Sequence, residues 1–467
     1  MKKSMFAVVS AIAAAAAFAD PSISQMVARQ QWPWSEKVMI DFHLSGVTAA
    51  TEVDVAVYRG ETKLTVPQTA ITGDFCELTA DGDYSITFDP SCLSDRPAKG
   101  ENLRFVLTPS TSSASSNWSD IMYKIIDLET YTVTDVTRGA IVRGEYGSYE
   151  TDYSKIGEGY NTTFSDVLIW TGVTNNPAYK TTKLVMRHIP AGTYPWYTTW
   201  TRWDKQTNEM TNDFYIGVFE LTQGQMAAMT NNLIAKAGLS PTYVTSDYYN
   251  PQSFEGSTKP LSQWSPSALF GHYNERYLKV TNSRGVLGIL NNKIAEIVNG
   301  HYFTLPGFSQ WYYACWAGTD TFYYDGLGGS ARAGIPAEAS HDDRLDVLGR
   351  YKANGGIVDN GDGTTTTNGT VAVGSYRPNA FGLYDMIGNV HEYLLDYLGA
   401  PAQKDGLPAD ATYNNSYFAG GSYLNGAYLD ATNFFKPGNR QTNYGNGRHS
   451  DVGYRLMLWI EPEGAGE

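Results

Sequence analysis

The sequence has little charge, few cysteines and no concentration of positive charge. Of its 467 residues only 18% are charged, and 34 basic against 48 acidic residues give a net charge of −14. No run of lysine or arginine could neutralise the phosphates of a nucleic acid, so nucleic-acid binding is not expected. After residue 19 no stretch approaches the roughly 20 apolar residues that cross a bilayer, so no membrane span is expected there.

The residue spacings of common catalytic sites are also missing. The seven histidines include no His-Glu-x-x-His pair and show no ligand spacing, which argues against a zinc hydrolase. GGSYLNG around Ser422 is not a nucleophile elbow, because Leu424 stands where the second glycine belongs. No P-loop occurs, and the glycines of DGLGGSARAG follow no strand and open no helix, which disfavours a dinucleotide site. HDDR, residues 341–344, is interpreted as a solvated charged turn.

The first residues predict export. Lys2 and Lys3 precede an apolar stretch that ends in Ala-Phe-Ala at residues 17–19, the small-x-small pattern of a signal-peptidase site. We therefore expect residues 1–19 to be a signal peptide, with cleavage before Asp20, and the mature protein to be periplasmic, extracellular or at the cell surface. The alternative is an uncleaved segment that anchors the N-terminus.

The three cysteines leave the redox state open. Cys76 and Cys92 lie in one early segment and are able to form a disulfide in an oxidising compartment, the alternative being two buried thiols. Cys315 is left alone.

What the chain does contain is aromatic and glycine residues, with 13% aromatics, 33 tyrosines and 46 glycines. This composition is typical of a loop-rich globular protein packed around rings. The length predicts two domains. Residues 20–134 alternate apolar and polar residues in short runs such as KVMIDFHLSG and DIMYKIIDL, which predicts a small antiparallel β-sandwich. Residues 135–182 read as a connector, 183–460 as a second domain of α+β type, and 461–467 as a tail.

In the second domain, KLVMRHIPAGTY and FYIGVFELT are predicted strands. The second strand leads into QGQMAAMTNNLI, where Thr222 can cap a helix. LPGFSQWYYACWAG holds another helix, with Trp311 and Cys315 on one face and Gly318 placed to stop it. Residues 320–450 show almost no periodic apolar pattern, so we expect an irregular fold held by aromatics, turns and metal ions.

Five segments occur in a characteristic order: FYIGVFELTQGQM, FTLPGFSQWYYACWAG, VGSYRPNAFGLYDMIGNVHEY, FAGGSYLNGAY and DVGYRLML. In this order and spacing, residues 183–460 resemble the formylglycine-generating enzyme family, also called sulfatase-modifying factors. The resemblance implies a C-type-lectin-like fold low in regular secondary structure, with exported or lumenal members and structural calcium. The N-terminal sandwich lies outside it.

The resemblance does not extend to the catalytic residues of that family. Its oxidases hold copper with two cysteines, one three residues after the serine of GGS and the other five residues further on. Those positions are Asn425 and Asp430 in this chain. An amide and a carboxylate do not replace the soft thiolate ligands of Cu(I), so no copper and no formylglycine-generating activity are expected. Cys315 is interpreted as a core residue.

The calcium sites of the family have better matches. One ion is held there by a side chain just after GLY, two carbonyls of the GNV turn and the following Glu, which implies Asp385, the carbonyls of Gly388 and Val390, and Glu392. A second family site implies Asn354 and Gly355 together with Asp362 and Thr364. The alternative for that last pair, which lies in DNGDGT, is a plain hairpin turn. His391 replaces the tryptophan usual in the family; a packing role and a ligand-contact role both remain open.

Residues 412–450 contain seven Asn and five Tyr, a combination found in paratopes and sugar sites, although Asn and Tyr also tile ordinary loops. The expected function is a non-catalytic module that binds an unknown glycan, peptide or protein. The predicted contact residues are Tyr423, Asn425, Tyr428, Asp430, Arg440 and His391. The alternatives are an enzyme of the broader family with an unrecognised site, and a structural or surface protein that binds a partner through its sandwich.

Overall fold

The computed structural model describes nineteen stretches of the chain. These are residues 20–30, 35–93, 102–111, 117–151, 167–197, 205–235, 238–271, 275–276, 280–294, 298, 300–319, 323–325, 341–355, 357–359, 365–367, 369–397, 411–412, 416–424 and 448–460. The predicted signal peptide and the tail at 461–467 lie outside them. In the described part of the chain, no helix combines the length and the apolar character that a bilayer span requires.

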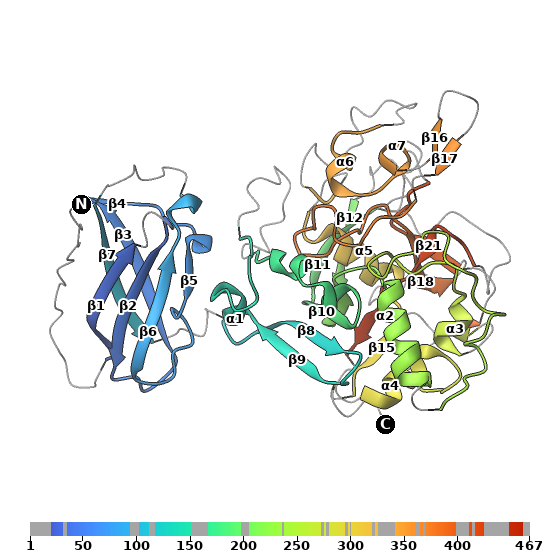
Figure 1. The fold of residues 1–467 in the computed structure, drawn as a ribbon, viewed down its shortest axis with the longest axis horizontal. Coiled ribbons are helices and arrows are strands. Elements are labelled where there is room, and N and C mark those ends of the chain that lie inside the picture. The colour runs from blue at the N-terminus through green and yellow to red at the C-terminus, as the bar shows by residue number, and fades with distance from the viewer. Residues whose placement is uncertain are drawn as a thin grey trace. The chain divides into compact units, whose positions relative to one another are not determined.

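The chain divides into two compact units. Unit 1 comprises residues 1–122, 136–151 and 170–173, and unit 2 comprises 123–135, 152–169 and 174–467. The fold class expected from the sequence, a β-rich N-terminal part followed by a mixed domain with few helices, is confirmed (Figure 1).

Unit 1 is built from two antiparallel sheets (Figure 1). In the first sheet the strand order is β1 (Ser22–Gln30), β2 (Val38–Ser45), β6 (Gly82–Phe88) and β5 (Ile71–Gly73). In the second it is β4 (Thr62–Lys63), β3 (Thr51–Arg59) and β7 (Leu103–Thr111). The short helices are η1 (Gln68–Ala70), η2 (Pro90–Cys92) and α1 (Arg138–Val142).

Alternating side chains form the core of this sandwich. Every second residue of β2 is buried, as the period of two predicts. The rings of Phe88 from β6 and Phe105 from β7 meet edge to face with centroids 5.5 Å apart, so the two sheets share one core. Cys76 and Cys92 are both free thiols. Of the two alternatives left open by the sequence, the structure has free thiols and no disulfide, but only one thiol is buried. Cys76 is buried beside Arg143, while the Sγ of exposed Cys92 lies 3.7 Å from the carbonyl of Thr69.

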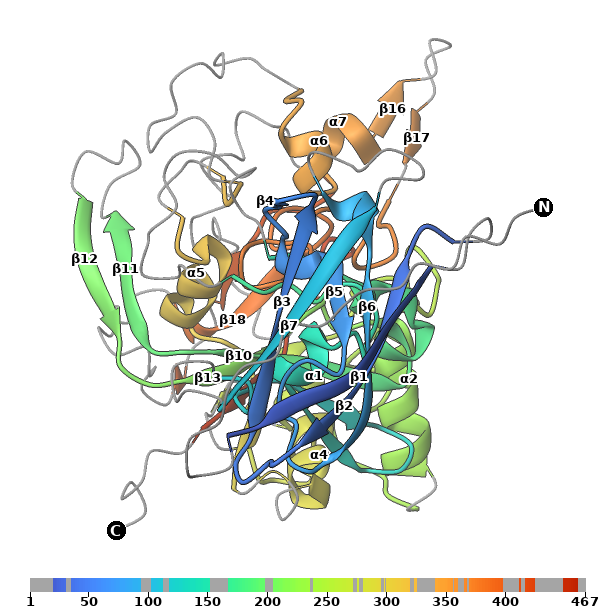
Figure 2. The same ribbon diagram turned by 90° about the vertical axis from the view of Figure 1, so that its left-hand side faces the viewer.

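Unit 2 is organised around a six-stranded sheet. Its strand order is β15 (Tyr302–Thr304), β22 (Met457–Trp459), β13 (Phe214–Gly217), β10 (Lys183–Ile189), β8 (Ile121–Asp127) and β9 (Val133–Thr137). A three-stranded sheet has the order β20 (Ser416–Ala419), β18 (His391–Tyr397) and β21 (Val452–Gly453). The remaining strand pairs are the hairpin β11 (Gly192–Tyr197) with β12 (Lys205–Met210), seen in Figure 2, β14 (Glu275–Arg276) with β19 (Ala411–Thr412), and β16 (Ile357–Asp359) with β17 (Thr365–Thr367).

One strand assignment from the sequence needs correction. The segment DIMYKIIDL was expected in the sandwich, but β8 pairs with β10 in the sheet of unit 2, for example Val185 with Ile125. The reason lies in its burial pattern, because Tyr123 and Ile126 are fully buried and their neighbours Met122 and Ile125 are buried as well. A strand buried on both faces belongs in the middle of a covered sheet rather than on a half-exposed sandwich face.

The helices of unit 2 are short. They are α2 (Gln223–Ala228), the π-helical turn η7 (Met229–Ala235), α3 (Pro266–Phe270), α4 (Val286–Ile294), α5 (Phe308–Trp316), α6 (Leu345–Leu348) and α7 (Lys352–Gly355). Two 3-10 turns precede β10, η5 (Thr171–Asn175) and η6 (Pro177–Lys180). The predicted cap of α2 is confirmed, since Thr222 and Gln225 form a reciprocal capping box. Helix α5 ends where expected, with Ala317 and Gly318 both at positive φ.

The core of unit 2 combines helix α5 with residues from turns. Trp311, Tyr313 and Cys315 of α5 are fully buried, and they pack with Leu383 and Met386 from the predicted irregular region. Cys315 is therefore a core residue, as the sequence suggested. Irregular backbone carries much of this core, which explains why residues 320–450 show no helix or strand periodicity.

Candidate functional site

The segment after β17 makes a tight left-handed turn at the predicted calcium site. Asp385, Gly388 and Asn389 have φ values of 56°, 82° and 59°. A Cβ on Gly388 would lie 2.2 Å from the carbonyl oxygen of Arg350, so both the conformation and the close approach require glycine. The turn is held by hydrogen bonds from the Gly388 N–H to the Gly420 carbonyl and from the Asn389 N–H to the Arg350 carbonyl.

Asp385 places a charged oxygen inside the protein. Its side chain is 1% exposed, and Oδ2 accepts a hydrogen bond of 2.6 Å from the Gly374 N–H. Oδ1 is buried and accepts no hydrogen bond in the described structure. Burial raises the pKa of this carboxyl to about 6. An unsatisfied buried carboxylate oxygen is costly, and a cation bound to it would remove that cost.

Glu220, which sequence reasoning missed, holds the other side of the turn. It lies between β13 and α2 and is fully buried. Its two carboxylate oxygens accept hydrogen bonds from Asn389 Nδ2 at 2.6 Å and from the Val390 N–H at 3.0 Å. Burial, and then the nearby charge of Asp385, raise the pKa of Glu220 well above its ordinary value. The available signal was its position as an acidic residue within the apolar run FYIGVFELT.

Glu392 does not present an open oxygen, which corrects its predicted role as a calcium ligand. Arg455 donates to it from Nε at 2.9 and 3.0 Å and from Nη2 at 2.6 Å, and Trp311 Nε1 donates at 2.6 Å. Arg455 also donates to the carbonyls of Gly217, Val218 and Tyr384. Both partners of this ion pair are fully buried, so the geometry commits Glu392 to a guanidinium.

Buried acidic groups outnumber buried basic groups around the turn. Glu220, Asp385 and Glu392 are buried carboxylates, and Arg455 is the fully buried cation among them. Lys180 is half-buried, and burial lowers the pKa of its amine although Asp385 acts in the opposite direction. The described residues therefore fit a cation at the unpaired Oδ1 of Asp385, and they do not fit direct ligation through Glu392.

The second predicted calcium site is described only in part. Asn354 Oδ1 accepts the Tyr351 N–H at 2.8 Å, its Nδ2 donates to the Gly349 carbonyl at 2.9 Å, and its carbonyl accepts from Arg350. These bonds close the turn of α7, where Gly355 is buried. Asp362 and Thr364 lie outside the described residues, so this ligand set stays a prediction.

The predicted ligand-contact residues separate into three groups. Tyr423 is 2% exposed; its ring packs edge to face on Phe254 with centroids 5.3 Å apart, so it is a core residue and its predicted contact role is corrected. His391 is half-buried, and its backbone N–H donates a hydrogen bond to the Asp451 carbonyl. Asn425, Tyr428, Asp430 and Arg440 lie outside the described residues.

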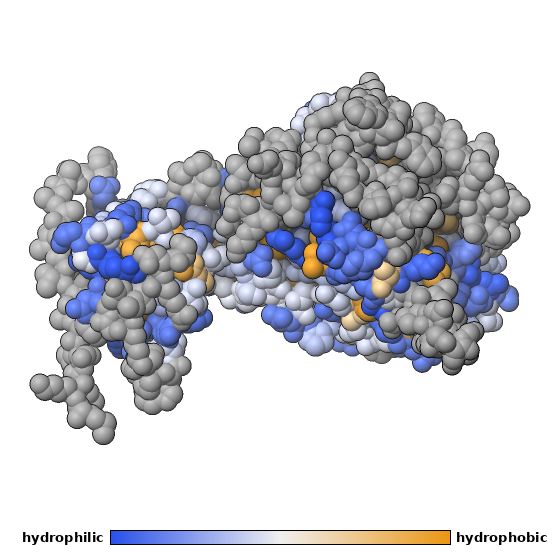
Figure 3. Space-filling model, turned by 90° about the horizontal axis from the view of Figure 1, so that it is seen from above, coloured by the Kyte–Doolittle hydropathy of each residue, from blue (hydrophilic) through white to orange (hydrophobic). Residues whose placement is uncertain are grey.

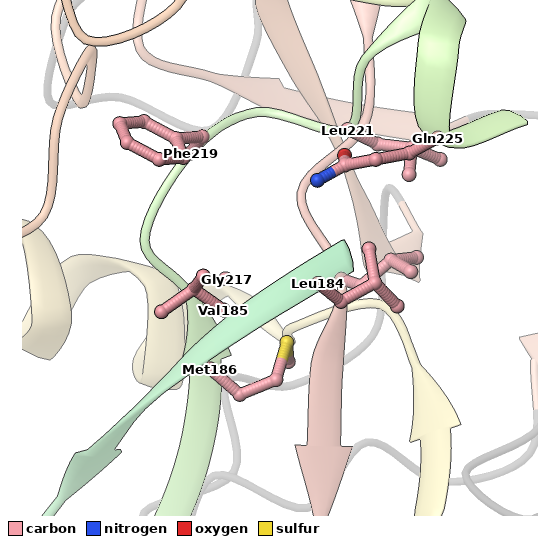
Figure 4. A pocket seen from close by; sticks show the side chains of 8 residues that line it. Leu184, Val185, Met186, Gly217, Phe219, Leu221 and Gln225 are labelled. Carbon is pink, nitrogen blue, oxygen red and sulfur yellow. The ribbon is translucent and has the colours of Figure 1, made fainter. Parts of the chain in front are cut away.

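Two other groupings were checked for chemistry. His341, Asp343 and Asp346 place potential ligand atoms within 4.8 Å of one another, but His341 already pairs with Asp346 Oδ2 at 2.7 Å on the surface. A small cavity beside β10 and β13, shown in Figure 4, is lined by Leu184, Val185, Met186, Gly217, Phe219, Leu221, Gln225 and Leu456. The amide of Gln225 is already bonded to the Lys183 carbonyl and the Thr222 N–H, so this cavity offers no free polar group.

Comparisons with known proteins agree with the motif order. Among solved structures, similar chains include PvdO from Pseudomonas aeruginosa (18% identity, 59% of this chain and 95% of that chain covered, TM-score 0.39) and Treponema denticola variable protein 1 (19%, 59% and 95%, 0.36). A third is CarF (18% identity, 60% and 99% covered, TM-score 0.37). None of the curated proteins matches this chain. The model of the sulfatase-modifying factor enzyme 1-like domain matches residues 173–460, more than half of the sequence, and the chain therefore belongs to this family.

Proposed function

We propose that this protein is an exported, non-catalytic member of its family that binds a ligand through the loops around residues 412–450. The observation that carries the proposal is the loss of the copper ligands, since Asn425 and Asp430 stand at the two cysteine positions of the oxidases. Cys315, the one cysteine of residues 183–460, is fully buried, and burial raises the pKa of its thiol. It therefore offers no thiolate to a metal or a substrate.

The composition of residues 412–450 supports binding. Tyrosine provides contact area at a low entropic cost, and asparagine both donates and accepts hydrogen bonds. The described surface of the molecule is largely hydrophilic in the view of Figure 3. Among the described residues, the exposed large apolar side chains are Val27, Leu239 and Val347, which lie far apart in the sequence. This pattern favours a polar ligand over an apolar docking partner.

Calcium is part of the proposal, as a structural ion bound to Asp385 and the carbonyls of Gly388 and Val390. The buried Oδ1 of Asp385 supports this assignment, because a hard oxygen-binding cation would supply its missing partner. Glu392 then acts through Arg455 and Trp311, which hold the strand that follows the turn.

The binding surface can be tested with the mature full-length protein on a glycan and peptide array. We expect at least one ligand, and we expect Asn425→Ala and Arg440→Ala to abolish its binding while the melting temperature stays nearly unchanged, because side chains that contact only a ligand contribute little to folding. Tyr423→Ala is the contrasting variant and should destabilise the fold, since this ring is buried. Ligand binding that survives both loop variants would contradict the proposal.

The competing functions give different outcomes. We expect no conversion of the cysteine of a sulfatase-type peptide to formylglycine in the presence of copper, as measured by mass spectrometry, because Asn425 and Asp430 do not replace two thiolates. Conversion at a catalytic rate would instead favour an enzyme of the broader family with an unrecognised site. If the protein instead bound a partner through its sandwich, Asn425→Ala and Arg440→Ala would leave the binding of that partner unchanged. Export is tested by N-terminal sequencing of the secreted protein, with Asp20 expected first.

A further inference from the structure

A tyrosine ring lies flat on a tryptophan at a place in unit 2 that the turn of Asp385 does not use. Tyr249 and Trp264 stand opposite each other in an isolated antiparallel bridge. Their rings are stacked with centroids 4.7 Å apart and planes 12° apart. Trp264 is 9% exposed, whereas Tyr249 is half-buried. Tyr249 is therefore the outer ring of the pair.

The pair is held in place by the core of the unit. The Tyr454 hydroxyl donates to the Trp264 carbonyl at 2.6 Å, and the fully buried ring of Tyr454 stacks on Tyr393. Backbone hydrogen bonds on both sides of the bridge join Asn250 to Gln263 and Ser265 to Tyr248. A ring fixed in this way loses little conformational freedom when a ligand packs against it.

The outer face of Tyr249 has no aromatic or cationic partner within the described stretches. Trp264 supplies its one ring contact there, and no lysine or arginine side chain lies over the ring. A half-buried tyrosine provides an apolar ring surface with a polar hydroxyl at its edge.

Charged residues of both signs lie close to the backbone of this bridge. Asp247, two residues before Tyr249, is exposed, and its carbonyl accepts a hydrogen bond of 3.1 Å from Nη1 of exposed Arg448. The Gln263 N–H donates to the His449 carbonyl, which places residues 448 and 449 beside both strands of the bridge. The carboxylate of Asp247 can accept hydrogen bonds and the guanidinium of Arg448 can donate them, with no net charge between the two.

This combination suits the chemistry of a sugar. A pyranose ring has a flat face of C–H bonds that packs on an aromatic ring, and its rim of hydroxyls both donates and accepts hydrogen bonds. The net charge of −14 disfavours a polyanionic ligand. We propose that Tyr249, Asp247 and Arg448 form a subsite for a neutral sugar residue of a glycan. The inference rests on the proposed binding function and names its ligand class.

The experiment measures the binding of maltohexaose, cellohexaose, laminarihexaose and chitohexaose to the mature full-length protein by calorimetry and saturation-transfer NMR. At least one of them should bind. Tyr249→Ala should weaken that binding about tenfold or more, whereas Tyr249→Trp, which keeps a flat ring, should retain it. Tyr58→Ala is the matched control, because Tyr58 is a half-buried tyrosine of unit 1 with the guanidinium of Arg104 4.1 Å from its ring. Arg448→Ala and Asp247→Ala change exposed side chains and remain informative if Tyr249→Ala does not fold.

The outcomes separate this inference from the proposed function. Failure of all four oligosaccharides to bind overturns the sugar subsite, and so does undiminished binding by folded Tyr249→Ala. If an array peptide depends on Asn425 and Arg440 while no oligosaccharide binds, the proposed function stands and the sugar subsite falls. Oligosaccharide binding that depends on Tyr249 and not on Asn425 or Arg440 supports the subsite and moves the ligand surface away from residues 412–450.

Discussion

At the residue scale, Arg455 donates hydrogen bonds from all three nitrogens of its guanidinium. It is fully buried, it pairs with Glu392, and it donates to three carbonyls from β13, its following turn and the segment before Asp385. The sequence motif DVGYR contains this arginine, but its partner lies 63 residues earlier. Hydrogen bonds to every nitrogen of the guanidinium offset the cost of burying it.

We predict that Arg455→Ala destabilises unit 2 by about 3–5 kcal/mol, because Glu392 is left as an uncompensated buried charge. Denaturant unfolding of the full-length protein measures the change. Arg448→Ala is the control, since this arginine is exposed and its loss should change stability by less than about 0.5 kcal/mol. Adding Glu392→Gln to Arg455→Ala should recover part of the loss. Equal stabilities for wild type and Arg455→Ala would contradict the ion-pair argument.

At the element scale, β8 is a strand that the sequence pattern assigned to the sandwich and that pairs with β10 in unit 2. Its register with β10 is supported by an ion pair of 2.8 Å between Asp127 and Lys183, the two residues that face each other at its end. Asp127 Oδ1 also accepts the N–H groups of Glu129 and Thr130, which closes the turn towards β9. Although burial acts in the opposite direction, the bond from Lys183 and the two N–H groups lower the pKa of Asp127 to about 2.

A pH dependence of stability follows from this carboxylate. The pKa of Asp127 is about 2 in the folded protein and about 3.9 in an unfolded chain, so its stabilisation is complete above about pH 5 and is lost as the pH falls through the folded pKa. Because Lys183 is partly exposed, we expect Asp127→Ala to cost only about 1 kcal/mol at neutral pH, with most of the difference lost by about pH 2.

Chemical unfolding of wild type and Asp127→Ala at several pH values tests this expectation. Asp135→Ala is the matched control, because Asp135 pairs with Lys124 near the same strands but its side chain is 42% exposed. A difference between wild type and Asp127→Ala that stays constant down to pH 2 would show that the carboxylate charge does not stabilise the β8 turn.

At the scale of the whole molecule, the described part of unit 2 combines irregular backbone with buried carboxyl groups at Glu220, Asp385 and Glu392. We predict that calcium stabilises the mature protein and that chelation lowers its melting temperature, because an ion that binds only the folded form adds about 2.7 kcal/mol at a hundredfold excess over its dissociation constant. Asp385→Ala should remove most of the response to calcium. Asp385→Asn, which removes the buried charge, should melt at a higher temperature than wild type in chelator.

Calorimetry with and without chelator, together with elemental analysis, tests the calcium prediction. Asp343→Ala serves as the control, because it removes an exposed carboxylate from the surface cluster with His341 and Asp346. If Asp343→Ala and not Asp385→Ala abolishes the response, the ion binds at that cluster. Superimposable melting curves and no bound calcium would show that the turn at Gly388 folds without an ion.

The sequence by itself determined features that depend on neighbouring residues. The capping box of Thr222 and Gln225, the end of α5 at Gly318 and the alternation of β2 all follow from local chemistry, and the order of five motifs was enough to identify the family. The tight turn at Gly388 was also readable, because only glycine tolerates its conformation and its contact with Arg350.

Only the tertiary structure decided which distant groups meet. Glu220 reaches Asn389 across 169 residues and Trp311 reaches Glu392 across 81, and no periodicity encodes either pairing. Periodicity also does not encode the pairing of β8 with β10, the packing of Tyr423 on Phe254 or the stacking of Tyr249 on Trp264. Hydrophobic pattern indicates that a residue is buried or exposed in an element, whereas the identity of its partner depends on how the elements pack.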